Sequence, residues 1–106
     1  MKPDKKPVSL RRHLRWFAEA MERKLSLNDH KGGWDDEEPR EMLEASWNEM
    51  AEVSDALARW TEKPTYENAM AVLAETADAA NYLLFVADLV RMSNDIPLVV
   101  PEDLGT

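Results

Sequence analysis

Four carboxylates are spaced in a way that suits metal binding. Glu49 and Glu52 are three residues apart, and so are Glu75 and Asp78. In a helix this spacing places both side chains of a pair on one face, about one turn apart. A turn is expected at Lys63-Pro64, midway between the pairs. Antiparallel packing of the flanking helices therefore predicts Glu49 near Asp78 and Glu52 near Glu75.

A cluster of this kind has a defined chemistry. Carboxylates that converge at a helix interface without counter-charge repel one another and lose hydration, at a cost of several kcal/mol each. Mg²⁺ removes this cost because it binds carboxylate oxygens and keeps positions for water and substrate phosphates. We therefore expect Glu49, Glu52, Glu75 and Asp78 to hold Mg²⁺, with Mn²⁺ able to replace it. The alternative, ordinary surface charge, suits Glu49 and Glu52 better than Glu75 and Asp78, which interrupt an apolar segment.

Two of three predicted helices carry these acids. A second helix is expected to begin within 35–39 and to run to about Trp60, and a third, capped by Thr65, should run from Tyr66 to about Ser93. The residues expected to form the buried stripe of the second helix are Leu43, Trp47, Met50, Val53 and Leu57. The third helix is apolar around its whole circumference, so we expect it to be buried on nearly every side.

A first helix and a glycine-containing loop precede the hairpin. Ser9 is expected to cap the first helix. The apolar stripe of this helix is predicted to contain Leu10, Leu14, Phe17, Met21 and Leu25. In the loop that follows, Lys31 can neutralise phosphate oxygens, Gly33 can allow close backbone approach and Trp34 can stack on a base. The alternative is that Trp34 packs on the following helix and Lys31 is solvated.

Asn81 lies one turn beyond Asp78, on the same side of the third helix. Its amide can donate and accept hydrogen bonds, so it can bind a phosphate, a ribose hydroxyl or a metal-bound water. The alternative is a buried asparagine that fixes a helix interface.

Composition limits the partners and the compartment. The 106 residues suffice for one domain, with a flexible basic tail at 1–8 and an extended tail at 95–106. A net charge of −8 argues against duplex nucleic acid, and the absence of cysteine favours an intracellular protein. The sequence shows neither a signal peptide nor an apolar run of about 20 residues, so we expect no membrane segment. Small helical chains often complete their cores by self-association, and we expect a homodimer or homotetramer.

Part of the sequence resembles a known family. Asn48-Glu49-Met50-Ala51-Glu52, followed after twenty-two residues by Glu75-Thr76-Ala77-Asp78, resembles the ExxE and ExxD signature of MazG-like pyrophosphohydrolases. The similarity covers about residues 30 to 92 and includes 77–82, Ala-Asp-Ala-Ala-Asn-Tyr, and 31–34, Lys-Gly-Gly-Trp. One position departs from the pattern: Asn48 stands where many members have a second acid before the first ExxE.

The resemblance implies an activity. MazG-like enzymes hydrolyse nucleoside triphosphates between the α and β phosphates, which implies an Mg²⁺-dependent reaction with Glu49 or Glu52 assisting deprotonation of water. It also implies an all-α fold, four-helix-bundle-like after oligomerisation, with Lys31, Gly33, Trp34 and Asn81 binding the nucleotide. The short phage and bacterial members suggest that the substrate is a purine deoxynucleotide, dGTP or dATP. They also suggest a cytoplasmic location, which for a phage protein is the cytoplasm of the host. The alternative is a non-catalytic helical interaction module with the same fold.

Overall fold

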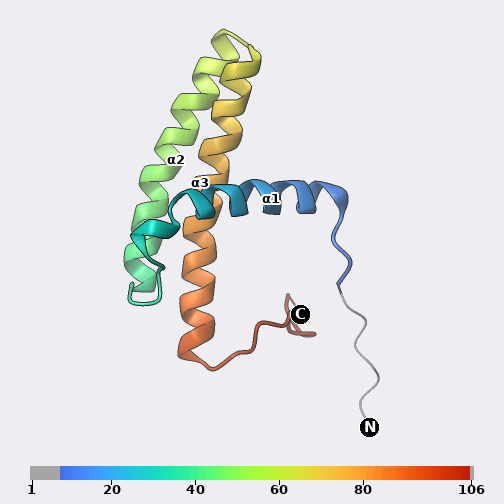
Figure 1. Ribbon diagram of the computed structural model, residues 1–106, viewed down its shortest axis with the longest axis vertical. Helices are drawn as coiled ribbons and strands as arrows, with labels where there is room; N and C mark the ends of the chain where they lie inside the picture. Colours follow the sequence, from blue (N-terminus) through green and yellow to red (C-terminus); the bar gives the residue numbers. More distant parts are fainter. Residues whose placement is uncertain (1–7, 106) are drawn as a thin grey trace.

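Residues 8–105 are described by the computed structural model, and they form three α-helices and a short 3₁₀ turn with no β-strand in that range (Figure 1). The all-helical prediction is confirmed. The proposed basic tail lies almost wholly outside the described residues.

The second and third helices form an antiparallel hairpin. Helix α2 spans Pro39–Glu62 and α3 spans Tyr66–Ser93. The start of α2 falls within the predicted range, with proline in its first turn. Thr65 caps α3 as predicted, because its hydroxyl accepts a 3.1 Å hydrogen bond from the Asn68 amide N–H. The side chain of Asn68 also donates to the carbonyl of Lys63 at 2.9 Å, which closes the turn.

Helix α1 lies across the hairpin and packs on α3 (Figure 1). It spans Arg12–Leu27, and the expected Ser9 cap is wrong: Arg11 occupies the N-cap position without a side-chain hydrogen bond. Of its predicted apolar stripe, Phe17, Met21 and Leu25 are half-buried, whereas Leu14 is exposed and Leu10 lies before the helix and is exposed. A 3₁₀ turn, η1 (Asp29–Lys31), then leads into the loop before α2.

The most deeply buried side chains of the hairpin are mostly small. The described residues that are buried are Ser46, Ala56, Ala77, Ala79, Asn81 and Leu89. The predicted stripe of α2 is partly wrong, because Trp47 and Met50 are 58% and 55% exposed and Leu57 is also exposed. Because Ser46 and Ala56 face α3, α2 is rotated so that small and acidic residues, not its largest apolar ones, lie at the interface.

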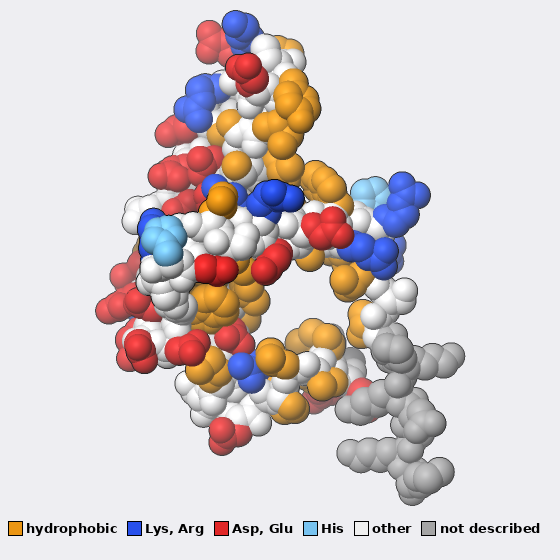
Figure 2. Space-filling view, in the orientation of Figure 1, with side chains coloured by type: hydrophobic (Ala, Val, Ile, Leu, Met, Phe, Trp, Pro, Cys, Tyr) orange, Lys and Arg blue, Asp and Glu red, His pale blue; other side chains and the backbone are white. Residues whose placement is uncertain are grey.

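The prediction that α3 is buried on nearly every side is also wrong for a single chain. Met70, Leu83 and Val90 remain exposed, because α2 and α1 cover only part of its circumference. Figure 2 shows acidic side chains gathered along α2 and hydrophobic ones exposed along α3.

Helix α3 reaches the length and mean hydropathy, 1.3 over its best 18 residues, of a membrane span. Only 17% of that window is buried within the single chain, but α3 carries Glu75, Asp78 and Asp88 along its length, and acidic side chains are rare in membrane spans. The absence of a membrane segment therefore stays a prediction, as does the cytoplasmic location.

The segment after α3 is only partly extended. A turn at Asn94-Asp95 ends the helix, with Asp95 at a positive φ of 54°. Two further backbone hydrogen bonds, from Val99 to Pro97 and from Leu104 to Pro101, bend the chain within the predicted extended tail. Proline also favours local turns, so the prolines that led to the prediction of an extended tail are compatible with these bends.

Candidate metal and nucleotide site

Three of the four predicted metal ligands converge between α2 and α3. One carboxylate oxygen from each of Glu49, Glu52 and Glu75 lies within 4.8 Å of the other two. The two glutamates of α2 meet the glutamate of α3 because the hairpin turns where the sequence predicts. The spacing of the two pairs was thus a sound guide to the register of the helices.

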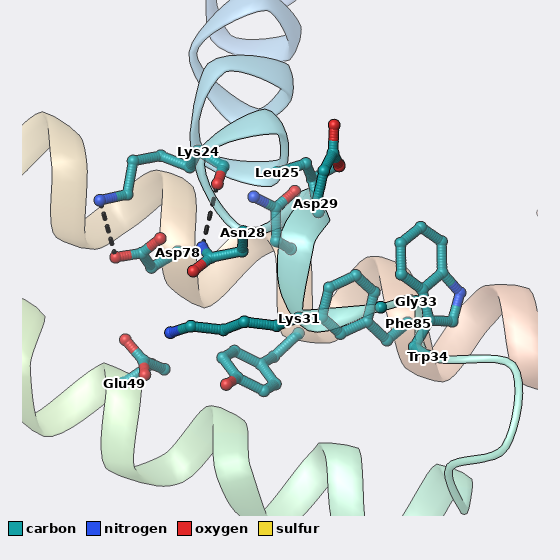
Figure 3. Close-up of a pocket in the computed structure, with 13 residues that line it drawn as sticks. Lys24, Leu25, Asn28, Asp29, Lys31, Gly33, Trp34, Glu49, Asp78 and Phe85 are labelled. Carbon is teal, nitrogen blue, oxygen red and sulfur yellow. Dashed lines mark hydrogen bonds and ion pairs between the residues drawn. The ribbon is translucent and has the colours of Figure 1, made fainter.

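Asp78 behaves differently from the other three acids. Its Oδ2 lies 3.4 Å from the Nζ of Lys24, on α1, and it is not part of the group of three (Figure 3). Its charge still acts on the cluster, since it helps to raise the pKa of Glu49. Asp78 therefore lies beside the cluster as predicted, but with an ammonium group as its nearest partner.

The cluster has too little positive charge around it. Burial raises the pKa of Glu49 to about 7, and the negative charges of Glu52, Asp78 and Glu75 contribute in that order. Burial is also the largest cause that raises the pKa of Glu75. The hydrogen bond and the negative charge of Glu52 raise this pKa further, whereas the positive charge of Lys24 lowers it. These directions indicate that the carboxylates need either protons or a cation in order to share this space.

Two buried oxygens at the site have no hydrogen-bond partner among the described residues. They are Oε2 of Glu75 and Oδ1 of Asn81. Asn81 is only 4% exposed, and its Nδ2 donates to the Met21 carbonyl at 3.0 Å. The amide thus fixes α1 against α3, as one sequence interpretation held, and still leaves an acceptor unused. Because buried polar atoms are rarely unpaired, both oxygens indicate a missing donor or cation.

The donor set fits a hard divalent cation. The unpaired atoms and the carboxylates that repel one another all offer oxygen ligands, which Mg²⁺ and Mn²⁺ prefer. The group of Glu49, Glu52 and Glu75 contains no nitrogen or sulfur ligand. Glu49, Glu52 and Glu75 could hold such an ion, with Asp78 within reach of the same region.

A cavity of about 470 Å³ adjoins the cluster, between α1, the loop after it and the hairpin. This volume lies within the range of small-molecule sites. All four predicted nucleotide-binding residues line it, together with two of the predicted metal ligands: Lys31, Gly33, Trp34, Asn81, Glu49 and Asp78. Figure 3 shows the Lys31 side chain extending towards Glu49. The fold therefore brings the loop and the acids to one cavity.

Trp34 is held in place by α3. Its indole stacks on Phe85 with centroids 4.4 Å apart, and its Nε1–H donates to Asp88 at 3.0 Å. Asp88 also accepts a 2.7 Å hydrogen bond from Arg91, and these two hydrogen bonds lower its pKa. Trp34 thus packs on a helix, as the alternative interpretation proposed, but the helix is α3 and not the adjacent α2.

Sequence reasoning missed several residues of the site. Lys24 could have been found, because it places a charge beside Met21 and Leu25 on the apolar side of α1. Phe85 and Asp88 had no comparable signal, since their roles depend on where the loop meets α3.

No family model, curated protein or solved structure matches this chain. The resemblance to MazG-like enzymes therefore depends on the quoted motifs alone.

Proposed function

We propose that this chain hydrolyses a nucleoside triphosphate, in an Mg²⁺-dependent reaction, to the monophosphate and pyrophosphate. The observation that carries the proposal is the convergence of Glu49, Glu52 and Glu75 beside a cavity that also contains Lys31 and Trp34. Acids alone would repel a triphosphate, so a site of this kind is productive only when a cation lies between the two.

The acids of the site bind the metal ion in this proposal, and one of them also assists the attacking water. Glu49, Glu52 and Glu75 hold the ion, with Asp78 at the edge of the group. When bound, Mg²⁺ supplies charge neutralisation for the phosphates and acidifies a water molecule. Glu49 is the one member of the group of three that also lines the cavity, so it is better placed than Glu52 to accept the proton of the attacking water.

The loop before α2 provides the nucleotide contacts. Lys31 faces the acidic side of the cavity, where it can pair with phosphate oxygens (Figure 3). Gly32 has a φ of 87°, which favours glycine and shapes the turn beside Gly33. Phe85 stacks on one face of Trp34, so in this proposal a base would stack on the opposite face. A purine, in dGTP or dATP, would use that surface most fully, and this preference follows the family resemblance.

We further propose that the chain works as a homodimer or homotetramer. Support comes from large exposed apolar side chains on both hairpin helices, Trp47, Met50 and Leu57 on α2 and Leu83 on α3. A second copy would cover these faces and produce the four-helix-bundle-like assembly.

A comparison of matched glutamine variants tests the proposed activity. Glu75→Gln removes a ligand and should reduce pyrophosphate release more than a hundredfold, whereas Glu44→Gln, an exposed position on α2, should leave it within about twofold. Far-UV circular dichroism checks that both variants are folded. Near-normal turnover in Glu75→Gln would refute the site, and a wild-type protein that binds Mg²⁺ and nucleotide without turnover would support the interaction module.

A further inference from the structure

Lys24 is a cation built into the acidic side of the cavity. It lies in the last turns of α1, and its Nζ is 3.4 Å from Oδ2 of Asp78, across the interface with α3. The backbone carbonyl of Lys24 accepts a 3.1 Å hydrogen bond from the side chain of Asn28. The helix turn is therefore fixed while the long side chain can change its partner.

The ion pair explains why Asp78 is separate from the other acids. An Nζ to Oδ2 distance of 3.4 Å is longer than a strong charge-assisted hydrogen bond, and both side chains are partly exposed. Such a pair contributes little to stability and is easily exchanged. A divalent cation held by Glu49, Glu52 and Glu75 would attract Asp78 and compete with Lys24 for it.

A released Lys24 would need a new anionic partner. Lys24 and Lys31 both line the cavity, one from α1 and one from the loop, so two ammonium groups border a space next to the acids. The phosphates of a nucleoside triphosphate carry more negative charge than one divalent cation neutralises. A lysine ammonium is a compact charge with three donors, which suits phosphate oxygens.

We propose that Lys24 is a triphosphate-binding residue that Asp78 holds in the metal-free protein and releases to the phosphates when a divalent cation binds. This inference rests on the proposed function and deepens it, because it assigns a residue that recognises the phosphate chain and not the base. Lys24 should therefore discriminate triphosphate from monophosphate.

The test measures metal and nucleotide binding separately. Lys24→Met keeps the length of the side chain and removes its charge, and Lys24→Gln is a second variant in case the first is poorly folded. Arg23→Met is the matched control, because it removes a positive charge from the adjacent, exposed position, which does not line this cavity. Calorimetry gives the affinity for Mn²⁺ alone, and then for an α,β-methylene deoxynucleoside triphosphate and for the monophosphate with Mg²⁺ present.

The proposal expects effects of opposite sign. Loss of Lys24 should leave Mn²⁺ affinity equal or increase it by a few fold, since a competitor for Asp78 is gone. It should weaken binding of the triphosphate analogue by about tenfold, equivalent to about 1.4 kcal/mol, and change monophosphate affinity by less than about threefold. Arg23→Met should change none of these constants by more than about twofold.

Two results would overturn the role of Lys24: weaker Mn²⁺ binding in both Lys24 variants, or unchanged affinity for the triphosphate analogue. If Glu75→Gln still abolishes Mn²⁺ binding in that case, the proposed metal site stands without Lys24. If the wild-type protein binds neither Mn²⁺ nor the analogue, the proposed function and this inference both fail.

Discussion

Replacing Trp34 with alanine should separate the structural role of the loop from its role in binding. The substitution removes the stack on Phe85 and the hydrogen bond to Asp88. An aromatic pair is worth about 0.5–1.5 kcal/mol beyond its buried area, and a hydrogen bond to a charged acceptor about 1.5–3 kcal/mol when buried. Because Trp34 is only half-buried, we expect a loss of about 2 kcal/mol, or roughly 8–16 °C in Tm.

The assay combines thermal melting with steady-state kinetics on the same preparations. Trp34→Phe keeps a ring on Phe85 but loses the donor, so its Tm should fall by about half as much as that of the alanine variant. Trp16→Ala removes a mostly exposed indole from α1 and should cost no more than about 0.5 kcal/mol. If Trp34 also stacks on the base, its loss should raise KM more than about tenfold with a smaller change in kcat.

Two outcomes would count against this reasoning. A Trp34→Ala variant that melts within about 2 °C of the wild type would show that the contacts with Phe85 and Asp88 do not hold the loop. A variant that is destabilised but keeps its affinity for nucleotide would show that Trp34 has only a packing role.

Three further predictions concern charge and assembly. Glu49 binds its proton more tightly in the folded chain, with a pKa raised from 4.5 to about 7. The Tm of the metal-free protein should therefore fall as pH rises from about 5 to about 7.5, and excess Mg²⁺ should reverse this fall. A flat metal-free profile would contradict the charge repulsion. Glu75→Gln should raise the metal-free Tm at pH 8 by about 5 °C, measured in EDTA, and a sharp decrease would argue against clustering. Trp47→Glu should lower the molecular mass measured by light scattering. An unchanged mass would show that this face of α2 is not the interface between copies of the chain.

Periodicity and turn signals predicted the elements well. Pro39 and Thr65 mark helix starts that depend on local chemistry, and both lie where expected. The position of the turn fixes the register of the hairpin, which is why the sequence places Glu52 near Glu75; the sequence paired Glu49 with Asp78, whereas in the structure Glu49 joins Glu52 and Glu75.

Other features depend on tertiary geometry and could not be predicted in the same way. The rotation of α2, which exposes Trp47 and buries Ala56, depends on how closely the two helices approach, and small residues decide that distance. The pairing of Asp78 with Lys24 depends on where α1 crosses the hairpin, and no local pattern specifies that crossing. The stack of Trp34 on Phe85 depends on the path of an irregular loop.

The products formed in isotopically labelled water test the central claim most directly. Purified protein is incubated with Mg²⁺ and each of the four deoxynucleoside triphosphates in ¹⁸O-water, and the products are identified by ³¹P NMR and mass spectrometry. Attack at the α-phosphorus should yield monophosphate and pyrophosphate in equal amounts, with ¹⁸O in the monophosphate and no turnover in EDTA. Diphosphate with inorganic phosphate, ¹⁸O in the pyrophosphate, or no turnover of any triphosphate would contradict the account.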